Sequence, residues 1–437
     1  MKIYTIGGYE EVGKNMTAIE VNDEIVILDM GYDMEAVIEE DNEIEEMTTK
    51  DTIKAGAIPK DKEIHQKSDK VKAIVVGHGH LDHVGGVPKL AGSYDCPVIS
   101  TPYTKKIIQR MVREDRKDLN NELVEMNTGE RRKVSENIEI EFVNITHSIP
   151  QATMIVLHTP EGKVAYSLDY RLDKEPLLGD KPDYERMNEL GEEGVKLFIG
   201  DSTRIDEEGA GSSEKTVKTE LKHTLNQAYN EGGGVFVTTF SSHIERLNSI
   251  IDVNNGRRKI AFIGRSLKEY TESGEEIDLI DLSNIEVASY HNEVEDLMSK
   301  ISRNKEDWLV VCTGNQGEPR SVLKRIATGD YPLEIKEGDH VIFSSSVIPS
   351  PVNRANRYKL EKVLKEKGAR QYKDIHISGH ALREDNRDML RMLKPDNILP
   401  AHGDTEMLAS YAKLAMEEGY DLNDNLFICQ NGNVLEI

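Results

Sequence analysis

The sequence has neither a long apolar run nor a leader segment. Its 437 residues contain no stretch of 18 or more apolar residues, and the start is not basic, then apolar, then small. A membrane-spanning helix or a secretory signal would need such a segment. We therefore expect a soluble, cytoplasmic protein with no membrane partner.

Cysteine is also scarce. The three cysteines, Cys96, Cys312 and Cys429, are widely separated and share no paired spacing. This pattern argues against a disulfide scaffold and suits a reducing cytosol. The chain is longer than one hydrophobic core usually absorbs, so we expect two or three domains.

Positive charge is in deficit, with 55 basic residues, 79 acidic residues and a net charge of −24. A uniform negative field would repel nucleic acid. The charge is uneven, however, because residues 33–51 hold nine acids and one lysine, whereas residues 353–373 hold eight bases and two acids. We interpret the acidic run as a solvated face. The basic run is either another such face or the lining of a groove for a polyanion.

The pattern of strands and helices changes twice along the chain. Up to about residue 200, short apolar strands alternate with turns and end in Gly, Asp or His, which is typical of a sheet packed under helices. Strand, polar loop and helix units then follow, which predict a small parallel α/β domain, and the first pattern returns at residue 374. The sequence thus predicts an α/β protein with a first domain in two parts, 1–203 and 374–437, and an inserted domain, 204–373.

A cluster of metal-ligand side chains directly follows one predicted strand. The segment VKAIVVGHGHLDHVGG supplies His78, His80, Asp82 and His83. Residues two apart in an extended segment point the same way, so the first two histidines can share one metal. The aspartate and the third histidine can reach a second metal, and imidazole nitrogen with carboxylate oxygen suits zinc. A histidine-rich surface turn is the simpler alternative, and four ligand-type residues in so short a segment argue against it.

Other candidate ligands lie at later strand ends. NITHSIPQ presents His147, YSLDYR presents Asp169 and LPAHGD presents His402. Taken singly, each is more often an ordinary surface or core residue than a ligand. We interpret Asp29, at the end of EIVILDMG, as a carboxylate that orients the histidine loop without binding metal itself.

Together these motifs resemble the metallo-β-lactamase superfamily, whose fold is an αββα sandwich. The resemblance covers the whole chain and implies two zinc ions, with manganese as another metal that such sites accept. The ligands that it implies are His78, His80 and His147 for one ion, Asp82, His83 and His402 for the other, and Asp169 bridging both. Paired metals hydrolyse phosphodiesters, but also lactams and thioesters, so this motif alone leaves the substrate open.

Further motifs narrow the substrate. FIGDST with Asp201, SGHA with His380 and PAHGD with His402 resemble motifs A, B and C of the β-CASP group, the nucleic-acid-processing branch with an inserted α/β domain. A histidine in motif C is typical of its RNA-processing members. GNQGEP and FSSSVIP resemble the ribonuclease J family, although SPVNRANR departs from the bacterial pattern. Because neither an extra C-terminal domain nor N-terminal KH domains are present, the sequence is most similar to the short archaeal type.

This similarity implies a 5′→3′ exoribonuclease that acts on single-stranded RNA in RNA decay or maturation, and a homodimer. In GGGVFVTTFSSHIERL a strand runs into a helix behind serine hydroxyls, where free N–H groups and the positive helix end suit a phosphate. An ordinary serine N-cap would explain that pattern alone. The residues that the family implies for holding a 5′-monophosphate are Ser241, Ser242, His243, His376 and Ser378.

Three residues receive catalytic roles from the same resemblance. Asp82 steers a zinc-activated hydroxide, His380 stabilises developing charge or protonates the leaving oxygen, and Asp201 orients His380 or a metal ligand. An endoribonuclease of the same family, cutting internally, is the main alternative. A lactonase or thioesterase and a catalytically idle RNA-binding scaffold are less favoured, because the inserted domain and the full ligand set argue against them.

Overall fold

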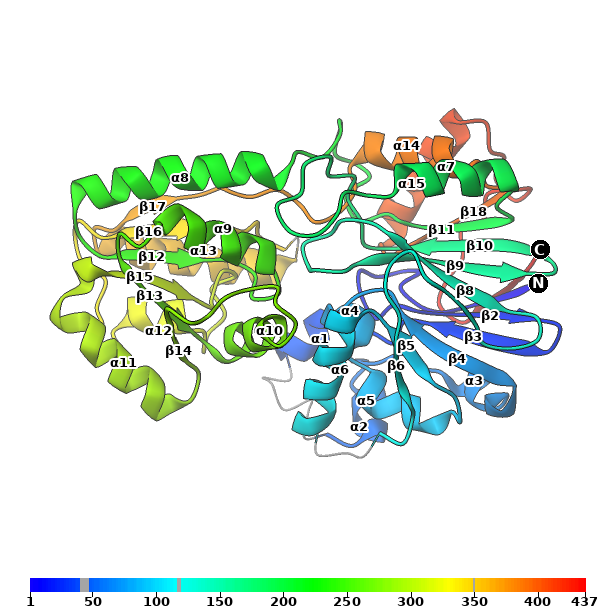
Figure 1. Cartoon of the computed structure of the whole chain (residues 1–437), viewed down its shortest axis with the longest axis horizontal. Coiled ribbons are helices and arrows are strands. Elements are labelled where there is room, and N and C mark those ends of the chain that lie inside the picture. The colour runs from blue at the N-terminus through cyan, green and yellow to red at the C-terminus, as the bar shows by residue number, and fades with distance from the viewer. Residues whose placement is uncertain (40–46, 116–118, 349) are drawn as a thin grey trace. The chain divides into compact units, whose positions relative to one another are not determined.

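The computed structural model describes residues 1–39, 47–115, 119–348 and 350–437. Part of the acidic run at 33–51 lies outside these residues. The chain forms two compact units, each built from more than one segment (Figure 1). The first unit comprises Met1–Lys174, Gly179–Gly211 and Gly379–Ile437, and the second comprises Glu175–Leu178 and Ser212–Ser378.

The order of the segments is that of one domain inserted into another, as the expected fold class requires. From the sequence we expected the chain to change domain after residues 203 and 373. In the structure the main changes of unit fall between Gly211 and Ser212 and between Ser378 and Gly379. The second change lies inside the motif HISGH.

The first sheet of the first unit is mixed. Its strands β1, β2 and β3 pair antiparallel, and β3 to β6 pair in parallel. The first and last strands of the chain are neighbours in this sheet. The strand order is β19 (Asn433–Glu436), β1 (Lys2–Gly7), β2 (Met16–Val21), β3 (Glu24–Leu28), β4 (Val71–Val76), β5 (Val98–Ser100) and β6 (Leu123–Glu125).

The second sheet of this unit combines antiparallel strands with a parallel edge formed late in the chain. Strand β11 pairs in parallel with both β10 and β18, so residues around 200 and 400 become neighbours. The strand order is β18 (Asn397–Ala401), β11 (Leu197–Asp201), β10 (Gly162–Ser167), β9 (Thr153–Thr159), β8 (Glu139–Asn144) and β7 (Arg131–Lys133).

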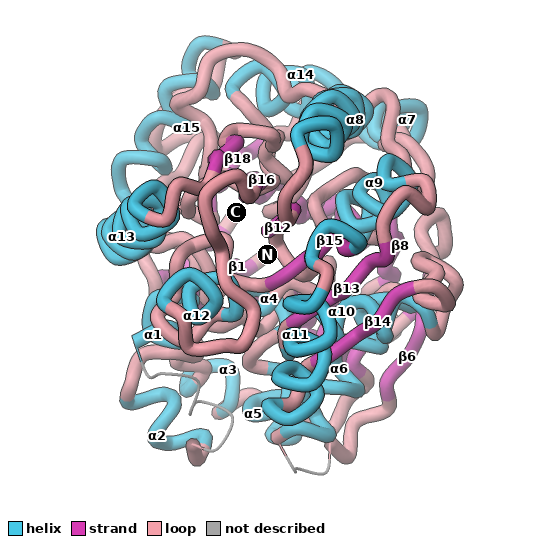
Figure 2. The backbone as a smooth tube through the Cα atoms, turned by 90° about the vertical axis from the view of Figure 1, so that its left-hand side faces the viewer, coloured by secondary structure: helices cyan, strands magenta, loops and turns pink. Residues whose placement is uncertain are grey.

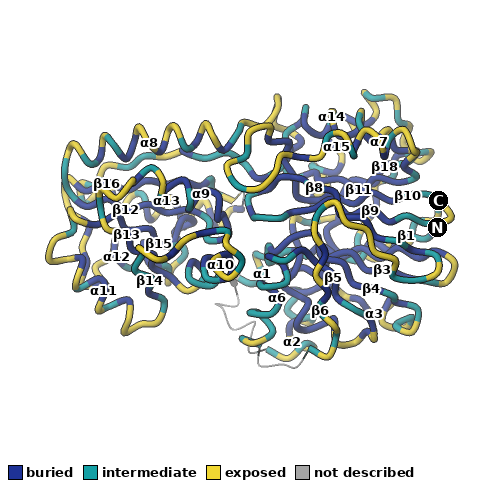
Figure 3. The backbone as a smooth tube through the Cα atoms, in the orientation of Figure 1, coloured by how far each residue is buried: buried dark blue, intermediate teal, exposed yellow. Residues whose placement is uncertain are grey.

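The two sheets pack face to face around one apolar core, to which Ile19 and Val75 contribute from one side and Phe142 and Leu399 from the other. A second core joins the outer face of the second sheet to α7 (Tyr184–Glu193), α14 (Arg383–Leu393) and α15 (Thr405–Glu417). The helices beside the first sheet are α1 (Met34–Glu39), α2 (Thr49–Lys54), α3 (Lys62–His65), α4 (Leu81–Val84), α5 (Val87–Leu90) and α6 (Pro102–Glu114). These layers form the expected αββα sandwich, and Figure 3 shows its strands largely buried.

The second unit is a parallel sheet with helices on both faces (Figure 2). Its strand order is β14 (Ile285–Ala288), β13 (Lys259–Ile263), β15 (Trp308–Cys312), β12 (Val235–Thr238), β16 (His340–Phe343) and β17 (Arg370–Tyr372). One face packs against α11 (His291–Arg303), α12 (Val322–Thr328) and α13 (Pro351–Glu366). The opposite face of the sheet is covered by α8 (Glu214–Glu231), α9 (Ile244–Asn254) and α10 (Arg265–Glu275). Because the strands are parallel, the loops after β12, β16 and β17 emerge at the same edge.

Candidate metal centre

The histidine motif lies at the carboxyl end of a buried strand of the first unit. The loop after β4 carries His78 and His80, and the short helix α4 carries Asp82 and His83. Close packing explains one of the glycines here, since a Cβ atom at Gly85 would lie 2.4 Å from a buried tyrosine ring. The four side chains therefore start from one tightly packed turn.

The first group of ligand atoms comes from three separate strand ends. His80 Nδ1 lies 3.1 Å from His78 Nε2 and 3.0 Å from His147 Nε2. Asp169 Oδ2 lies 3.4 Å from His78 Nε2 and 3.2 Å from His147 Nε2. Ligand atoms placed about 2.0–2.1 Å from a tetrahedral zinc ion are about 3.3 Å apart. These four atoms therefore suit one ion.

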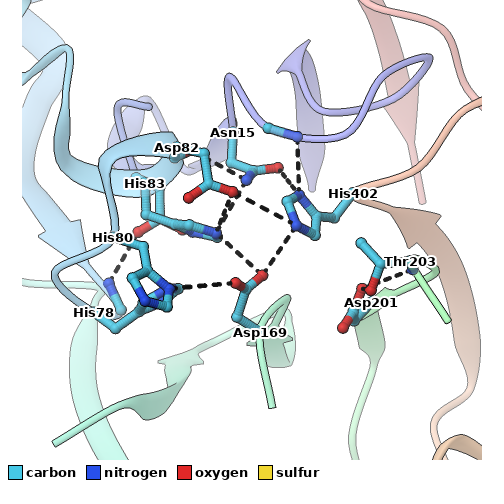
Figure 4. A network of polar contacts seen from close by, with 12 residues as sticks. Asn15, His78, His80, Asp82, His83, Asp169, Asp201, Thr203 and His402 are labelled. Atoms are coloured by element: carbon cyan, nitrogen blue, oxygen red, sulfur yellow. Dashed lines mark hydrogen bonds and ion pairs between the residues drawn. The ribbon is translucent and has the colours of Figure 1, made fainter. Parts of the chain in front are cut away.

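The second group shares the same aspartate. Asp169 Oδ1 lies 3.1 Å from His83 Nε2 and 3.2 Å from His402 Nε2. Asp82 Oδ2 lies 3.6 Å from His83 Nε2 and 3.7 Å from His402 Nε2. Figure 4 shows both groups meeting at Asp169. The structure thus brings all seven candidate metal ligands together, with one carboxylate oxygen directed to each group.

The electrostatics of Asp169 fit a position between two cations. The residue is buried, and its Oδ1 atom has no hydrogen-bond donor among the described residues. Burial alone would raise the pKa of this carboxyl, but His83 and His402 hold it well below its usual value. Burial also lowers the pKa of His147 to about 4, so this imidazole is neutral and its nitrogen is free to bind a metal. The donor set therefore matches two zinc ions, or other divalent metals that accept imidazole and carboxylate ligands.

Asp29 holds the histidine loop from behind, as the sequence predicted. His83 Nδ1 donates to Asp29 Oδ2 at 2.7 Å, and the Gly77 backbone N–H donates to Asp29 Oδ1 at 2.9 Å. The Tyr166 hydroxyl also donates to Asp29 Oδ2, at 2.9 Å. With its Nδ1 proton held in this way, His83 directs Nε2 toward the metal site.

Sequence reasoning missed a second supporting residue, Asn15. Its Oδ1 atom lies 2.9 Å from His402 Nδ1, and its Nδ2 donates to the Asp82 carbonyl at 3.1 Å. Asn15 is fully buried in the loop between β1 and β2. It joins the late histidine to the histidine loop, and a single asparagine in an ordinary turn sequence contains no signal of that role.

His380 and Asp201 form a pair beside the metal ligands. His380 Nδ1 lies 2.8 Å from Asp201 Oδ2, and His380 Nε2 lies 3.9 Å from Asp169 Oδ2. Asp201 Oδ1 also accepts from the Thr203 backbone and hydroxyl. Burial lowers the pKa of His380, but the carboxylates of Asp169 and Asp201 outweigh it and raise the pKa to about 9. Cations bound at Asp169 would offset part of that increase.

In the second unit, the two loops that the sequence predicts to hold a phosphate contact each other. The Phe240 ring lies 5.9 Å from the His376 ring, so the serine loop after β12 contacts the segment after β17. Ser241 is partly exposed and its hydroxyl lies 2.9 Å from that of Ser266. His243, in contrast, is fully buried at the N-terminus of α9, and its Nε2 lies 3.6 Å from Glu214. Ser378 is the last residue of this unit.

A buried ion pair that the sequence did not predict supports these loops. The Arg246 guanidinium forms a bidentate pair with Glu214, and both side chains are fully buried. The same guanidinium donates to the Ser344 carbonyl at 2.8 Å and to the Ile375 carbonyl at 3.2 Å. Arg246 therefore joins α8, α9 and the loops after β16 and β17.

Among the described residues, no helix is both long enough and apolar enough to cross a membrane. Comparisons with known families agree with the fold and site. The metallo-beta-lactamase superfamily model matches residues 9–264, the ribonuclease J beta-CASP domain model matches 232–362, and the model of a Zn-dependent metallo-hydrolase RNA specificity domain matches 369–425. The fold and site thus define a metallo-β-lactamase-type hydrolase with an inserted β-CASP domain.

Full-length relatives identify the family more closely. The chain is 48% identical to ribonuclease J of Pyrococcus abyssi over 100% of this chain and 97% of that protein. It is 43% identical to ribonuclease J of Methanocaldococcus jannaschii over 100% and 98% of the two chains. The chain belongs to the ribonuclease J family of metal-dependent nucleases. A crystal structure of a protein of unknown function from Enterococcus faecalis V583 shares the fold, with a TM-score of 0.66 at 17% identity over 99% of both chains.

Proposed function

We propose that the chain is a zinc-dependent 5′→3′ exoribonuclease. It releases mononucleotides from single-stranded RNA with a 5′-monophosphate, in RNA decay or maturation. The observation that carries the 5′-end preference is the contact between Phe240 and His376, because it joins the serine loop to the first residues of HISGH within the second unit. We further propose that the enzyme acts in the cytoplasm as a homodimer.

In the proposed reaction, His78, His80 and His147 would hold one ion and Asp82, His83 and His402 the other, and Asp169 would offer a carboxylate oxygen to each group. When bound, the two cations activate water and neutralise the charge of the scissile phosphate. The Asp82 carboxylate accepts a hydrogen bond from the attacking water and orients it. His380 donates a proton from Nε2 to the leaving oxygen, while Asp201 holds its Nδ1 proton.

The proposed 5′-phosphate site is built from the hydroxyls of Ser241, Ser242 and Ser378 and the imidazole of His376. Ser242 precedes the N-terminus of α9, where the positive end of the helix dipole favours an anion. We assign buried His243 a supporting role behind the serines, because its side chain has no exposed surface. A terminal phosphate held in this way selects the 5′ end of the RNA in each round.

Three substrates of one sequence test the mode of cutting. Linear RNA with a 5′-monophosphate, the same RNA with a 5′-triphosphate, and its circular form are incubated with enzyme and the products are sized. We expect mononucleotides from the first, much slower release from the second and no cutting of the circle. Internal fragments from all three substrates would instead establish an endoribonuclease.

Two single substitutions, each at a histidine, test the catalytic role assigned to His380. His380→Ala should lose about 10²–10⁴-fold in turnover, which is the usual contribution of a general acid, while zinc content stays at the wild-type level. His291→Ala, at a histidine of α11 with 62% of its side chain exposed, is the matched control and should keep full activity. Wild-type turnover in His380→Ala would contradict the role given to this residue.

A further inference from the structure

The basic run of residues 353–373 is mostly helical and lies in the second unit. Most of it is helix α13, which starts after Ser350, whose hydroxyl accepts from the Asn353 backbone N–H. Leu360 and Leu364 of this helix are fully buried in the core with β16. The opposite side of α13 is solvent-exposed, so the helix is amphipathic along its whole length.

The structure separates the basic residues of this run into paired and unpaired ones. Arg357 is buried over the Phe343 ring and donates to the Asn315 carbonyl at 2.8 Å. Arg370 pairs with Glu231 and Lys373 pairs with Glu361, so these three cations are used inside the unit.

Three other cations of α13, Arg354, Lys359 and Lys365, are exposed and form no ion pair within the described residues. A fourth, Lys362, has its Nζ atom 4.0 Å from a carboxylate oxygen of Glu366. The exposed side of the helix is therefore positive, on a chain whose net charge is −24.

An exposed aromatic ring lies within this positive face. Arg354, Tyr358, Lys362 and Lys365 follow one another at intervals of three or four residues, which places them in one row on the helix. The row is about 17 Å long, at 1.5 Å per residue. Tyr358 is 70% exposed, and Val352, six residues before it, is 46% exposed. The row therefore combines one exposed aromatic ring with cations on both sides of it along the helix.

Single-stranded RNA matches the chemistry of this row. Its phosphates are the charge complement of the cations, and any base can stack on the face of a tyrosine ring. Double-stranded nucleic acid would not offer a free base to Tyr358. An acidic protein would satisfy the cations but would leave the ring without a comparable partner.

The position of α13 in its unit places the start of this row near the loops of the proposed 5′-phosphate site. The helix starts at the edge of the sheet where the loops after β12, β16 and β17 emerge, and it runs back along the sheet from there. We propose that the exposed row Arg354, Tyr358, Lys362 and Lys365 binds the body of the RNA substrate, downstream of the nucleotides held by those loops. This inference rests on the proposed function, and it assigns a substrate-binding surface outside the metal centre.

The test measures binding separately from cleavage, in the His380→Ala background. The row variant is Arg354→Gln/Lys362→Gln/Lys365→Gln, and a second variant is Tyr358→Ala. The control variant, Lys215→Gln/Lys218→Gln/Lys222→Gln, removes the same charge from α8 on the opposite face of the sheet. Fluorescence anisotropy follows RNAs of about 20 and about 5 nucleotides, both with a 5′-monophosphate, over a range of salt concentrations.

We expect the row variant to bind the long RNA at least tenfold more weakly, and its salt slope to fall by about 2, at about 0.7 per lost phosphate contact. Tyr358→Ala should weaken binding of the long RNA by about fivefold or more, since stacking on one ring is lost. Both variants should bind the short RNA like the parent protein, and the α8 control should bind both RNAs like the parent. Unchanged thermal unfolding shows that the variants fold.

Equal binding of the long RNA by the row variant and the α8 control would overturn the proposal. So would a row variant whose weaker binding accompanies a change of oligomeric state in light scattering, because the face would then be a contact between copies of the chain. Failure of the proposed function is distinguishable, since a protein that does not act on RNA would bind neither length in any variant.

Discussion

Each unit contains a buried cluster of histidine and carboxylate side chains, and the two clusters differ in how their charge is balanced. In the first unit, Asp169 is surrounded by imidazoles, and its Oδ1 atom accepts no hydrogen bond from the described residues. In the second unit, ligand atoms of Glu214, His243 and Glu245 lie within 4.8 Å of one another. There, however, Arg246 occupies both oxygens of Glu214, and the backbone N–H groups of Leu177 and Leu178 donate to Glu245.

Ligand-type side chains at short range do not by themselves define a metal site. The carboxylates of the first cluster form ion pairs only with histidines among the described residues, and imidazoles can release their protons to bind a metal ion. The second contains its own cation and its own hydrogen-bond donors, so a metal ion would have to displace a bidentate ion pair. We therefore assign metals to the first cluster and a structural role to the second.

The largest expected effect comes from removing the shared ligand. Asp169→Ala should lose most of the bound metal and more than about 10³-fold in RNA hydrolysis, because both ions depend on this carboxylate. Metal content per chain, measured by plasma mass spectrometry, and product release together check this. Full metal content in Asp169→Ala would show that metal binding does not depend on this carboxylate. The charge balance of the two clusters would then not explain why only the first binds metal.

A substitution in the second cluster should lower the stability of the protein without changing its metal content. Glu214→Gln leaves the Arg246 guanidinium buried without its counter-charge, which should lower the free energy of unfolding by about 3–5 kcal/mol. Urea unfolding measures the loss, and bound metal should not change. The double variant Glu214→Gln/Arg246→Met should recover much of the stability, since no unpaired charge remains. A fall in bound metal in the single variant would show that the second cluster also binds an ion.

The smallest effect is expected behind the first cluster. Asp29→Asn keeps the shape of the side chain and tolerates the positive φ of +60° at this position, but it weakens the acceptor of the His83 Nδ1 proton. Metal affinity should fall by about 10–100-fold, as competition with a chelator can measure. Unchanged affinity would mean that packing alone orients the histidine loop.

Local patterns explain how far the sequence could predict the fold. Apolar strands ending in Gly, Asp or His, followed by strand, loop and helix units, indicated a sandwich with an inserted parallel domain, since these periodicities arise within single elements. The strand orders were beyond prediction. The parallel pairing of β11 with β18, which brings Asp201 near His402, joins segments that have no local pattern in common.

The residues that support the site could not be predicted from the sequence either. Asn15 and Arg246 carry out their roles only through partners far away in sequence, and neither belongs to a motif. Histidine and aspartate in a dense motif predict metal binding from their own chemistry, whereas an isolated asparagine or arginine is common in any chain.

The amino-acid sequence alone specifies the chemical groups of this protein: seven ligand-type residues, a serine loop before a helix, and one strongly basic run. The tertiary structure decided which of these groups meet and which are free. It left Arg354, Lys359 and Lys365 exposed while burying Arg357, and it divided HISGH so that His376 and Ser378 belong to one unit and His380 to the other. The physical reason is that charge balance and burial depend on partners that only long-range packing supplies.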